Sequence, residues 1–373
     1  MQINILGKMK TNKNLIVISA CAIALSIIGV VFVYSASKHS ALNSYGDSFF
    51  YLKKQIIGVI LGIIGMFVTT RINHNIFKKV YIVFYIIGLV LLLLVFVPGL
   101  GKSSYGATRW IGIGSITIQP SEIAKFCLII FLASYLTKID DINSIKKLLF
   151  VFLMGGLYLI CIMLEPNMSI TICVGLTLLF MLFIGGLRIK TFVLLLVPIV
   201  LAGVTLVIIE PYRLSRIVAF INPWENPLQE GYQLIQSLYA IGSGGMFGVG
   251  LFNSRQAELF LPFAESDFIF SIIAEEIGFL GCILVISIFT ILVTTIFKVG
   301  LTAKNKFSCF LCCGIGAIIA IQVILNIAVV TGSIPPTGLP LPFISAGSTS
   351  LLVFMSAIGV VLNVDRQSRK DRI

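Results

Sequence analysis

The sequence has few charged residues and almost no histidine. Charged side chains make up 11% of its 373 residues and hydrophobic ones 58%, whereas a soluble domain is roughly 25% charged. His39 and His74 are the only histidines, which argues against a His-ligated metal centre and against a Ser-His-Asp site. The chain also has no nucleotide-binding P-loop, no internal repeat and no soluble domain, so any energy it needs must come from its substrate or an ion gradient.

All eight cysteines fall in apolar runs. Cys309, Cys312 and Cys313 include a CxxC spacing, but their apolar surroundings favour inert buried thiols over a metal or redox role. The formal net charge of +12 is compatible with a nucleic-acid partner. The basic residues instead form short clusters between apolar runs, a pattern that the positive-inside rule explains without nucleic acid.

Apolar stretches of about 20 residues recur along the whole chain, and each is long enough to cross a bilayer as a helix. The sequence therefore predicts an all-α, polytopic membrane protein with about ten transmembrane helices, forming a single domain over residues 1–373. The predicted spans are 14–36, 55–72, 80–98, 120–137, 147–164, 168–186, 191–209, 267–297, 308–331 and 346–364.

Basic residues indicate the orientation of these spans. With a cytoplasmic N-terminus, 18 of the 27 Lys and Arg residues fall in inside segments and eight in outside segments, while Lys125 lies within a span. The bias recurs in every inside loop. Both termini are therefore predicted to be cytoplasmic, and the protein to be a multi-pass protein of the cell membrane.

One outside loop, about 210–266, is much longer than the others. It carries five glutamates, several prolines and a glycine cluster, and long loops with their own structure tend to be functional. Residues 228–241 are expected to form a half-buried interfacial helix within it. Two shorter outside loops, 99–119 and 332–347, are rich in polar and turn residues. The sequence therefore places any chemistry on the extracytoplasmic side.

Ionisable residues in or beside predicted spans are costly and therefore informative. Glu122 and Lys125, three residues apart, can pair on one helix face, either as a structural ion pair or as a polar patch that also touches a ligand headgroup. Asp267 begins the eighth span, either as an N-cap or as a functional carboxylate beside the long loop. Glu275 and Glu276 lie roughly 12–13 Å deeper along that helix. They are too deep to share a bond-making site with Asp267 and are expected to be buried structural groups with Lys or backbone partners.

Two external arginines are candidate ligands for an anion. Arg109 precedes Trp110 in a glycine-flanked turn, where it can bind a phosphate bidentately or anchor the chain at the membrane interface. Arg255 lies in another outside segment and is equally compatible with a phosphate contact and with a surface charge. The sequence alone leaves these alternatives open.

Seven segments follow one another along essentially the whole chain and form a recognisable set. They are 32–37 (FVYSAS), 106–112 (GATRWIG), 119–125 (QPSEIAK), 222–227 (NPWENP), 231–242 (GYQLIQSLYAIG), 266–278 (SDFIFSIIAEEIG) and 331–345 (TGSIPPTGLPLPFIS). Together they resemble the SEDS family (shape, elongation, division and sporulation), which includes FtsW, RodA and SpoVE. The first segment and the fourth resemble the FtsW and SpoVE branch more than RodA.

The resemblance implies a ten-helix peptidoglycan glycosyltransferase that polymerises lipid II. It also implies partners: a class B penicillin-binding protein as transpeptidase, and other division or sporulation membrane proteins. The family's essential aspartate matches Asp267, and its polar pair on the fourth helix matches Glu122 and Lys125. No cofactor is certain, and a divalent ion (Mg or Mn) held by carboxylate and phosphate oxygens is left open. The predicted substrate-binding residues are Arg109, Glu122, Lys125, Arg255, Gln119 and Ser345.

Three segments depart from the family pattern. Where the family often has Gln-Pro-Asp, this chain has Glu-Pro-Asn at residues 165–167. Ser266 replaces a common threonine, and residues 345–348 (SAGS) replace Ser-Tyr-Gly-Gly. These departures bear more on the branch of the family than on the activity.

The implied reaction needs one base. Pyrophosphate is already a good leaving group, so a single carboxylate suffices to take the proton from the 4-hydroxyl of the acceptor sugar, whereas glycosidases usually need two. Asp267 is the predicted base. Desolvation would raise its pKa and a helix N-terminus would lower it, and the sequence leaves open which effect dominates.

Two other functions fit a polytopic fold. A lipid II flippase would use the same substrate, but it would be expected to line a path through the membrane with charge, and here charge is concentrated outside. An inactive scaffold for division proteins would leave Asp267 unexplained. Division, sporulation and elongation are all compatible with the sequence.

Overall fold

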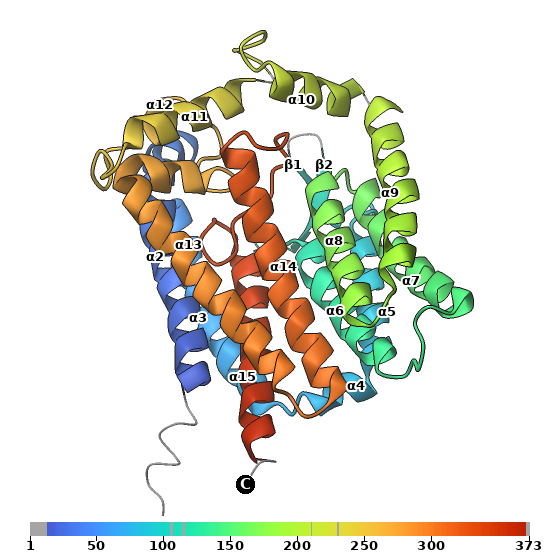
Figure 1. Ribbon diagram of the computed structural model, residues 1–373. Coiled ribbons are helices and arrows are strands. Elements are labelled where there is room, and N and C mark those ends of the chain that lie inside the picture. Colours follow the sequence, from blue (N-terminus) through green and yellow to red (C-terminus); the bar gives the residue numbers. More distant parts are fainter. Residues whose placement is uncertain (1–12, 105–106, 114–115, 210, 230, 371–373) are drawn as a thin grey trace, which may run out of the picture.

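The computed structural model describes residues 13–370, with gaps at 105–106, 114–115, 210 and 230. Long helices form a bundle, and shorter elements cover one end of it (Figure 1). Each of the ten predicted apolar stretches lies on a helix. These helices are α2 (Lys13–Tyr45), α3 (Phe50–Arg71), α5 (Tyr81–Leu94), α6 (Pro120–Leu136), α7 (Ile145–Leu164), α8 (Met168–Ile184), α9 (Ile189–Ile209), α13 (Ile269–Leu301), α14 (Lys306–Val330) and α15 (Ser348–Lys370).

Length and composition identify the membrane helices. Within the described residues, six helices are long and apolar enough to cross a membrane, namely α2, α3, α7, α13, α14 and α15, while α5 and α8 are apolar but shorter. A span needs about 20 apolar residues because the hydrocarbon core is about 30 Å thick. The multi-pass helical membrane fold is confirmed, and the number of ten crossings stays a prediction.

The covered end of the bundle is built from the two longest outside loops. Residues 99–119 contain a three-stranded antiparallel sheet, β1 (Gly101–Ser104), β2 (Ala107–Ile113) and β3 (Ile116–Ile118), in the order β1-β2-β3. The sequence indicated only polar and turn residues here, so this sheet is an addition to the predicted all-α fold. The loop after α9 forms α10 (Pro211–Ile221), α11 (Tyr232–Gly244) and α12 (Arg255–Leu259). The predicted interfacial helix 228–241 corresponds to α11, which begins and ends a few residues later. At the opposite end, α4 (Asn75–Lys79) joins α3 to α5.

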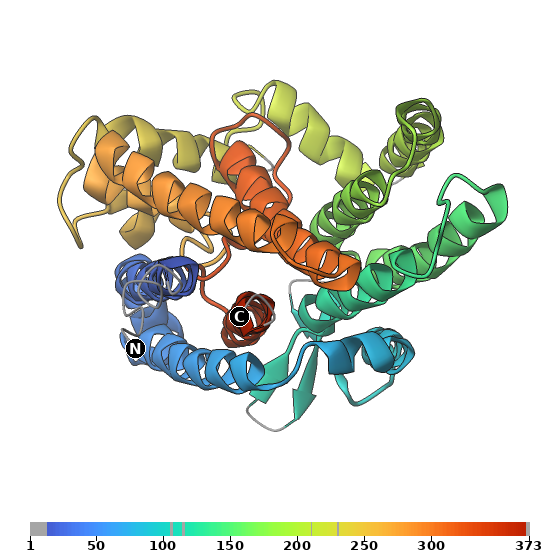
Figure 2. The ribbon, with the colours of Figure 1, turned by 60° about the horizontal axis from the view of Figure 1, so that its bottom comes forward.

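Helix α15 lies in the middle of the bundle (Figure 2). It packs along α3 through small residues, as membrane helices do when their backbones approach closely. A Cβ added to Gly58 would lie 3.1 Å from the Cα of Ser348, and one added to Gly359 would overlap Thr69. The Thr69 hydroxyl donates to the backbone carbonyl of Ser356 (2.8 Å). This packing fixes the first turn of α15 at the covered end.

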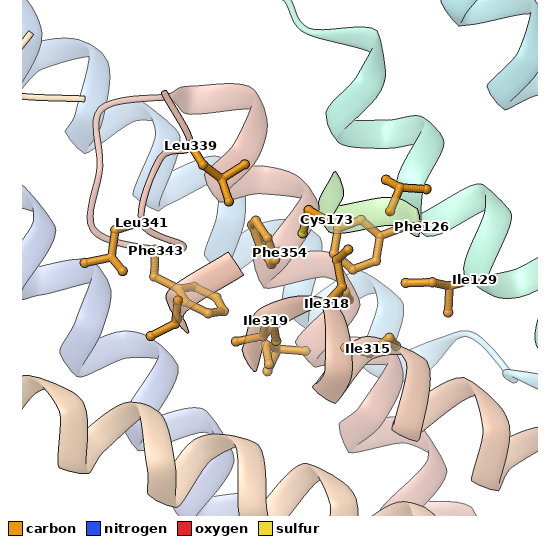
Figure 3. Packing of buried hydrophobic residues seen from close by; sticks show 14 of the residues in the cluster. Phe126, Ile129, Cys173, Ile315, Ile318, Ile319, Leu339, Leu341, Phe343 and Phe354 are labelled. Atoms are coloured by element: carbon orange, nitrogen blue, oxygen red, sulfur yellow. The ribbon is translucent and has the colours of Figure 1, made fainter. Parts of the chain in front are cut away.

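The loop between α14 and α15 turns back into the bundle. Its residues Leu339, Leu341 and Phe343 are buried, and Figure 3 shows them beside side chains of α6, α8, α14 and α15. Phe343 has a φ of 64°, a conformation that costs a bulky residue energy and persists only where packing enforces it. The burial of these three side chains anchors the loop that carries one wall of the candidate site.

Helix α13 contains two buried carboxylates near a break. Gly278 has a φ of 66°, which interrupts the helical geometry. Glu275 accepts hydrogen bonds from the Ser254 hydroxyl and from the backbone N–H of Arg255 (3.1 Å), and Glu276 accepts one from the Ser35 hydroxyl. Both are buried, as expected. The backbone N–H is one of the two kinds of partner expected, and serine hydroxyls are found where lysine was the other.

Candidate active site

A cavity of about 300 Å³ opens at the covered end of the bundle. It lies between the sheet, the first turn of α8, helix α10 and the turn that leads into α13. The loop between α14 and α15 and the first turn of α15 also line it. The residues that line it are Arg109, Trp110, Gln119, Asn167, Ile170, Arg216, Gln233, Phe263, Ser266, Asp267, Phe268, Pro336, Thr337, Gly338, Pro340, Ala346, Gly347, Thr349 and Ser350.

Asp267 lies in the wall of this cavity. The N-cap of α13 is Phe268, and no side chain caps this helix end, so the alternative that Asp267 is an N-cap is wrong. One carboxylate oxygen accepts a hydrogen bond from the Ser266 hydroxyl (3.1 Å). Gly338 faces the other oxygen, and a Cβ at that position would lie only 3.0 Å from it. The glycine therefore leaves room for a reacting group in front of the carboxylate.

Two buried polar side chains hold the turn that carries Asp267. Asn326 of α14 donates to the backbone carbonyls of Asp267 (2.8 Å) and Leu339 (2.6 Å). The Ser345 hydroxyl donates to the backbone carbonyl of Ser266 (2.6 Å) and accepts the N–H of Leu341 (2.7 Å). Both join the turn before α13 to the loop before α15. Ser345 was predicted to bind substrate. It is not one of the described residues that line the cavity, and its hydrogen bonds instead stabilise the backbone of the cavity wall.

Burial dominates the electrostatics of Asp267. Desolvation raises the pKa of this carboxyl above its ordinary value. The Ser266 hydroxyl and the charges of Arg109 and Arg216 act in the opposite direction and lower it. The sequence left open whether desolvation or a helix N-terminus would prevail, and the net direction is upward. A carboxylate with a raised pKa is a better proton acceptor than an ordinary aspartate.

Two arginines contribute positive charge to the cavity. Arg109 on β2 donates through Nε to the backbone carbonyl of Glu165 (3.3 Å) and through Nη2 to that of Pro166. Arg216 on α10 donates to the backbone carbonyl of Pro336 (3.1 Å). Arg109 is a predicted site residue. Arg216 was counted only among the external basic residues, and no local pattern marks it.

The predicted pairing of Glu122 with Lys125 is confirmed. The Lys125 ammonium lies 3.0 Å from one Glu122 oxygen and 2.8 Å from the Gln322 side-chain carbonyl. Both charged side chains are almost fully buried, and neither is among the described residues that line the cavity. Gln322 in turn donates to the backbone carbonyl of Pro340 (2.8 Å), which does line it. The ion pair therefore stabilises the cavity wall through Gln322 and Pro340. A role of the pair in binding substrate stays a prediction.

The structure brings together some of the predicted site residues and separates others. Asp267, Arg109 and Gln119 line the same cavity. Arg255 is an exposed residue at the start of α12 and is not among the described residues that line it. A contact between Arg255 and the substrate stays a prediction, and the position of Arg255 does not favour it.

Comparison with known proteins identifies the family. A family model for a cell cycle protein, covering FtsW, RodA and SpoVE, matches residues 15–370. The chain belongs to this family. Stage V sporulation protein E of Bacillus subtilis (strain 168) is 41% identical to this SEDS protein over 364 residues, which are 96% of this chain and 99% of that protein. A probable peptidoglycan glycosyltransferase FtsW of Geobacter sp. (strain M18) is 37% identical over 353 residues, 93% of this chain and 95% of that one.

Solved structures show the same fold. A chain from a structure described as the coordination of polymerization and crosslinking by a peptidoglycan synthase complex superposes on this SEDS protein with a TM-score of 0.80 and 26% identity, covering 95% of this chain and 98% of that one. The rod shape determining protein RodA of Thermus thermophilus superposes with a TM-score of 0.70 and 24% identity, over 94% of this chain and 96% of that one. The predicted family is confirmed, and the chain is an enzyme of the peptidoglycan glycosyltransferase class.

The composition of the cavity limits the chemistry of this SEDS protein. Among the described residues that line it, Asp267 is the one carboxylate, and it faces a cavity that also contains Arg109 and Arg216. The described residues contain no group of three or more His, Cys, Asp or Glu side chains arranged to hold a metal ion. The cavity thus offers one proton acceptor and two sites of positive charge.

Proposed function

We propose that this SEDS protein polymerises lipid II into glycan strands, with Asp267 as the general base. The observation that carries the proposal is the cavity in which one desolvated carboxylate lies near two guanidinium groups. The names of its relatives and the peptidoglycan synthase complex that shares its fold support the substrate class.

The chemistry follows from the charges in the cavity. Asp267 takes the proton from the 4-hydroxyl of the acceptor sugar as that oxygen attacks C1 of the donor sugar. The bond between C1 and the pyrophosphate oxygen breaks, and the pyrophosphate leaves with its polyprenyl chain. Arg109 and Arg216 stabilise the negative charge that develops on the departing pyrophosphate. A second carboxylate is unnecessary because no poor leaving group has to be protonated.

A second, apolar cavity of about 280 Å³ suits the lipid tail of this substrate. It lies between α3, α4, α5, α6, α14 and α15, and its walls include Phe84 and Phe126. Ser350 of α15 lines the polar cavity, whereas Val353 and Ala357 line the apolar one. Residues three or four apart lie on one helix face, so the two cavities follow one another along α15. A polyprenyl chain could run along this face while its pyrophosphate lies beside the arginines.

The proposal extends to the side of the membrane, the partner and the product. Basic residues are in excess in the predicted cytoplasmic segments, and this bias supports an extracytoplasmic active site. A class B penicillin-binding protein is the proposed partner, and septal or spore cell wall the proposed product. A divalent ion (Mg or Mn) stays a prediction. It would take ligands from Asp267 and from the pyrophosphate and water.

A flippase is the alternative, but no contact among the described residues favours it. Glu122 and Lys125 neutralise one another, and Glu275 and Glu276 accept hydrogen bonds from serine hydroxyls. The decisive measurement incubates the purified protein, alone and with its partner transpeptidase, with labelled lipid II. Glycan strands on a gel support the proposal. Translocation of lipid II in vesicles without any strand would replace it by the flippase.

Replacing Arg216 by alanine is expected to raise the KM for lipid II by about tenfold to a hundredfold, because a hydrogen bond to a charged group contributes about 1.5–3 kcal/mol. Arg216→Lys should recover part of this, since it keeps the charge but loses the planar fork. Initial rates of strand synthesis at varied lipid II concentration give the KM. Arg255→Ala is the matched control and should stay within about twofold of wild type. A larger effect at Arg255 than at Arg216 would exchange their roles.

A further inference from the structure

Asn167 is a buried side chain with one unused hydrogen-bond donor. It is the N-cap of α8, 4% of its surface is exposed, and it lines the polar cavity. Its side-chain oxygen Oδ1 accepts the backbone N–H of Ile170 (3.4 Å). Within the part of the chain that the structure describes, its side-chain nitrogen Nδ2 donates to no residue. A buried polar group without a partner is costly, so this donor beside a cavity indicates a ligand with an acceptor oxygen.

The place of this donor favours a negatively charged acceptor. Helix α8 is 17 residues long, and the N-terminus of a helix carries a partial positive charge that attracts anions. The first turn of α8 has no acidic residue to neutralise that charge, and Ile170 in this turn also lines the cavity. The amide and the helix end therefore border the cavity together.

An arginine of the site binds the turn before Asn167. Arg109 donates through Nε to the backbone carbonyl of Glu165 (3.3 Å) and through Nη2 to that of Pro166. These two residues directly precede Asn167 in the sequence. The contacts bring strand β2, which carries Arg109, to the N-terminus of α8. A phosphate group bound at this helix end is therefore also close to Arg109.

A second contact joins α8 to the loop that faces Asp267. The Ser169 hydroxyl donates to the backbone carbonyl of Thr337. The next residue, Gly338, lies in front of the Asp267 carboxylate, and a Cβ there would lie 3.0 Å from one of its oxygens. The N-terminus of α8 is therefore joined through this loop to the residue proposed as the base.

We propose that Asn167 binds the substrate pyrophosphate, with its side-chain NH₂ group donating to a phosphate oxygen at the N-terminus of α8. This inference rests on the proposed function, which supplies the pyrophosphate. An amide can cap the helix with its oxygen and donate to the ligand with its nitrogen. A carboxylate would cap the helix equally well, but it would repel a phosphate unless a cation lay between them. The family often has aspartate at this position, so the donor is a property of this chain.

The first measurement uses inorganic pyrophosphate as a probe and needs no turnover. The chain has two tryptophans, and Trp110 lines the cavity, so Trp110 fluorescence in a Trp224→Phe background reports binding. EDTA is present, so that no divalent ion bridges a carboxylate to phosphate. The Kd should rise about tenfold in Asn167→Ser, which loses the NH₂ donor without gaining charge. It should rise further in Asn167→Asp, which adds repulsion.

The matched control is Asn305→Asp. Asn305 is the N-cap of α14, and its side chain accepts the backbone N–H of Ser308 (2.7 Å), as Asn167 accepts that of Ile170. It is not among the described residues that line the cavity, so the Kd for pyrophosphate should stay within about twofold of wild type. Serine and aspartate are both good N-caps. The melting midpoints of the variants at position 167 should therefore stay close to that of wild type, which excludes a folding defect.

The second measurement is the KM for lipid II in the same variants. Loss of a contact that is made with bound substrate raises the KM and leaves kcat nearly unchanged. The KM should therefore rise in Asn167→Ser by about the same factor as the Kd for pyrophosphate, about tenfold, with kcat changing much less. A fall in kcat at unchanged KM would instead assign Asn167 to the shape of the site and overturn the proposed contact.

The remaining outcomes separate the two proposals. A wild-type Kd in both Asn167 variants, or a wild-type protein that binds no pyrophosphate, overturns the role of Asn167 while strand synthesis still supports the enzyme. An unchanged Kd with a raised KM also overturns it, because the amide then binds another oxygen of lipid II, such as a sugar acetamido carbonyl. An absence of strands together with the predicted differences in Kd overturns the proposed function and leaves the anion site standing. If Asn167→Asp does not fold, Asn167→Ser is sufficient for both measurements.

Discussion

Replacing Asp267 by asparagine is expected to lower kcat for glycan-strand synthesis by about 10²-fold to 10⁴-fold, the contribution usually made by a positioned general base. Asparagine has the same shape, and its side-chain carbonyl can still accept the Ser266 hydroxyl. It cannot take a proton from the acceptor hydroxyl. The change also removes a negative charge near Arg109 and Arg216, so the KM for lipid II should stay level or fall. A loss in kcat with no rise in KM is therefore the signature of a base.

The control for this experiment is Glu265→Gln. Glu265 lies two residues before Asp267, is also buried, and has a pKa that burial raises. It is not among the described residues that line the cavity. A neutral residue at position 265 should change kcat by no more than a few-fold, on the order of an ordinary structural perturbation. Wild-type kcat in Asp267→Asn would exclude the base role, and equal losses at both positions would point to a structural defect.

The pH dependence of strand synthesis gives an independent check. A general base acts in its ionised form, so the rate rises with pH through the pKa of the base. Because burial raises the pKa of Asp267, this limb should lie above the value of about 3.9 of an exposed aspartate. The limb should disappear in Asp267→Asn, leaving a low rate that does not increase with pH.

The fold was predictable because its main determinant is local. A run of apolar residues long enough to cross the bilayer becomes a helix whatever its neighbours are, since no other conformation satisfies its backbone there. The sheet formed by β1, β2 and β3 was missed because its strands are short and give no clear alternation of polar and apolar residues. Asp267 was found because it begins a predicted span beside the long outside loop, and because the essential aspartate of the family matches it.

The residues that surround Asp267 were predictable only in part. Arg216 reaches the cavity because helix α10 folds over the bundle, and this depends on long-range packing. Asn326 and Gln322 were available as signals, since an amide in an apolar helix needs a partner, but the partner could not be named. Glu165 was noted only as a departure from the family pattern. Its burial beside Arg109 appears only in three dimensions.

The ion pair of Glu122 and Lys125 was predicted correctly, but its presence alone does not tell whether it stabilises the bundle or binds the substrate. Three-residue spacing predicted the ion pair, and the structure has it. The sequence could not say whether the pair also touches a ligand. In the structure, Lys125 is 1% exposed, and its ammonium also lies 4.5 Å from the centre of the Phe354 ring. All of these contacts lie inside the bundle, which favours the structural role.

Replacing Lys125 by methionine should therefore act mainly on stability. Methionine keeps the length of the side chain but leaves Glu122 buried without its cation, which costs about 3–5 kcal/mol in soluble proteins. We expect a correspondingly large fall in the melting midpoint of the purified protein in detergent. Since Gln322 joins Lys125 to Pro340 at the cavity, kcat should fall as the wall loosens, while the KM changes less.

The double variant Glu122→Gln with Lys125→Met separates the structural role from the binding role. It removes the isolated charge along with its partner, and such replacements are often neutral or stabilising by about 1–4 kcal/mol. Most of the stability lost in Lys125→Met should therefore return, and strand synthesis should return with it. The interaction free energy from the double-mutant cycle measures the coupling of the two sites. If stability returns while the KM for lipid II stays raised, Lys125 touches the substrate after all. If both return together, the charge of Lys125 serves Glu122, and the pyrophosphate must rely on Arg109 and Arg216.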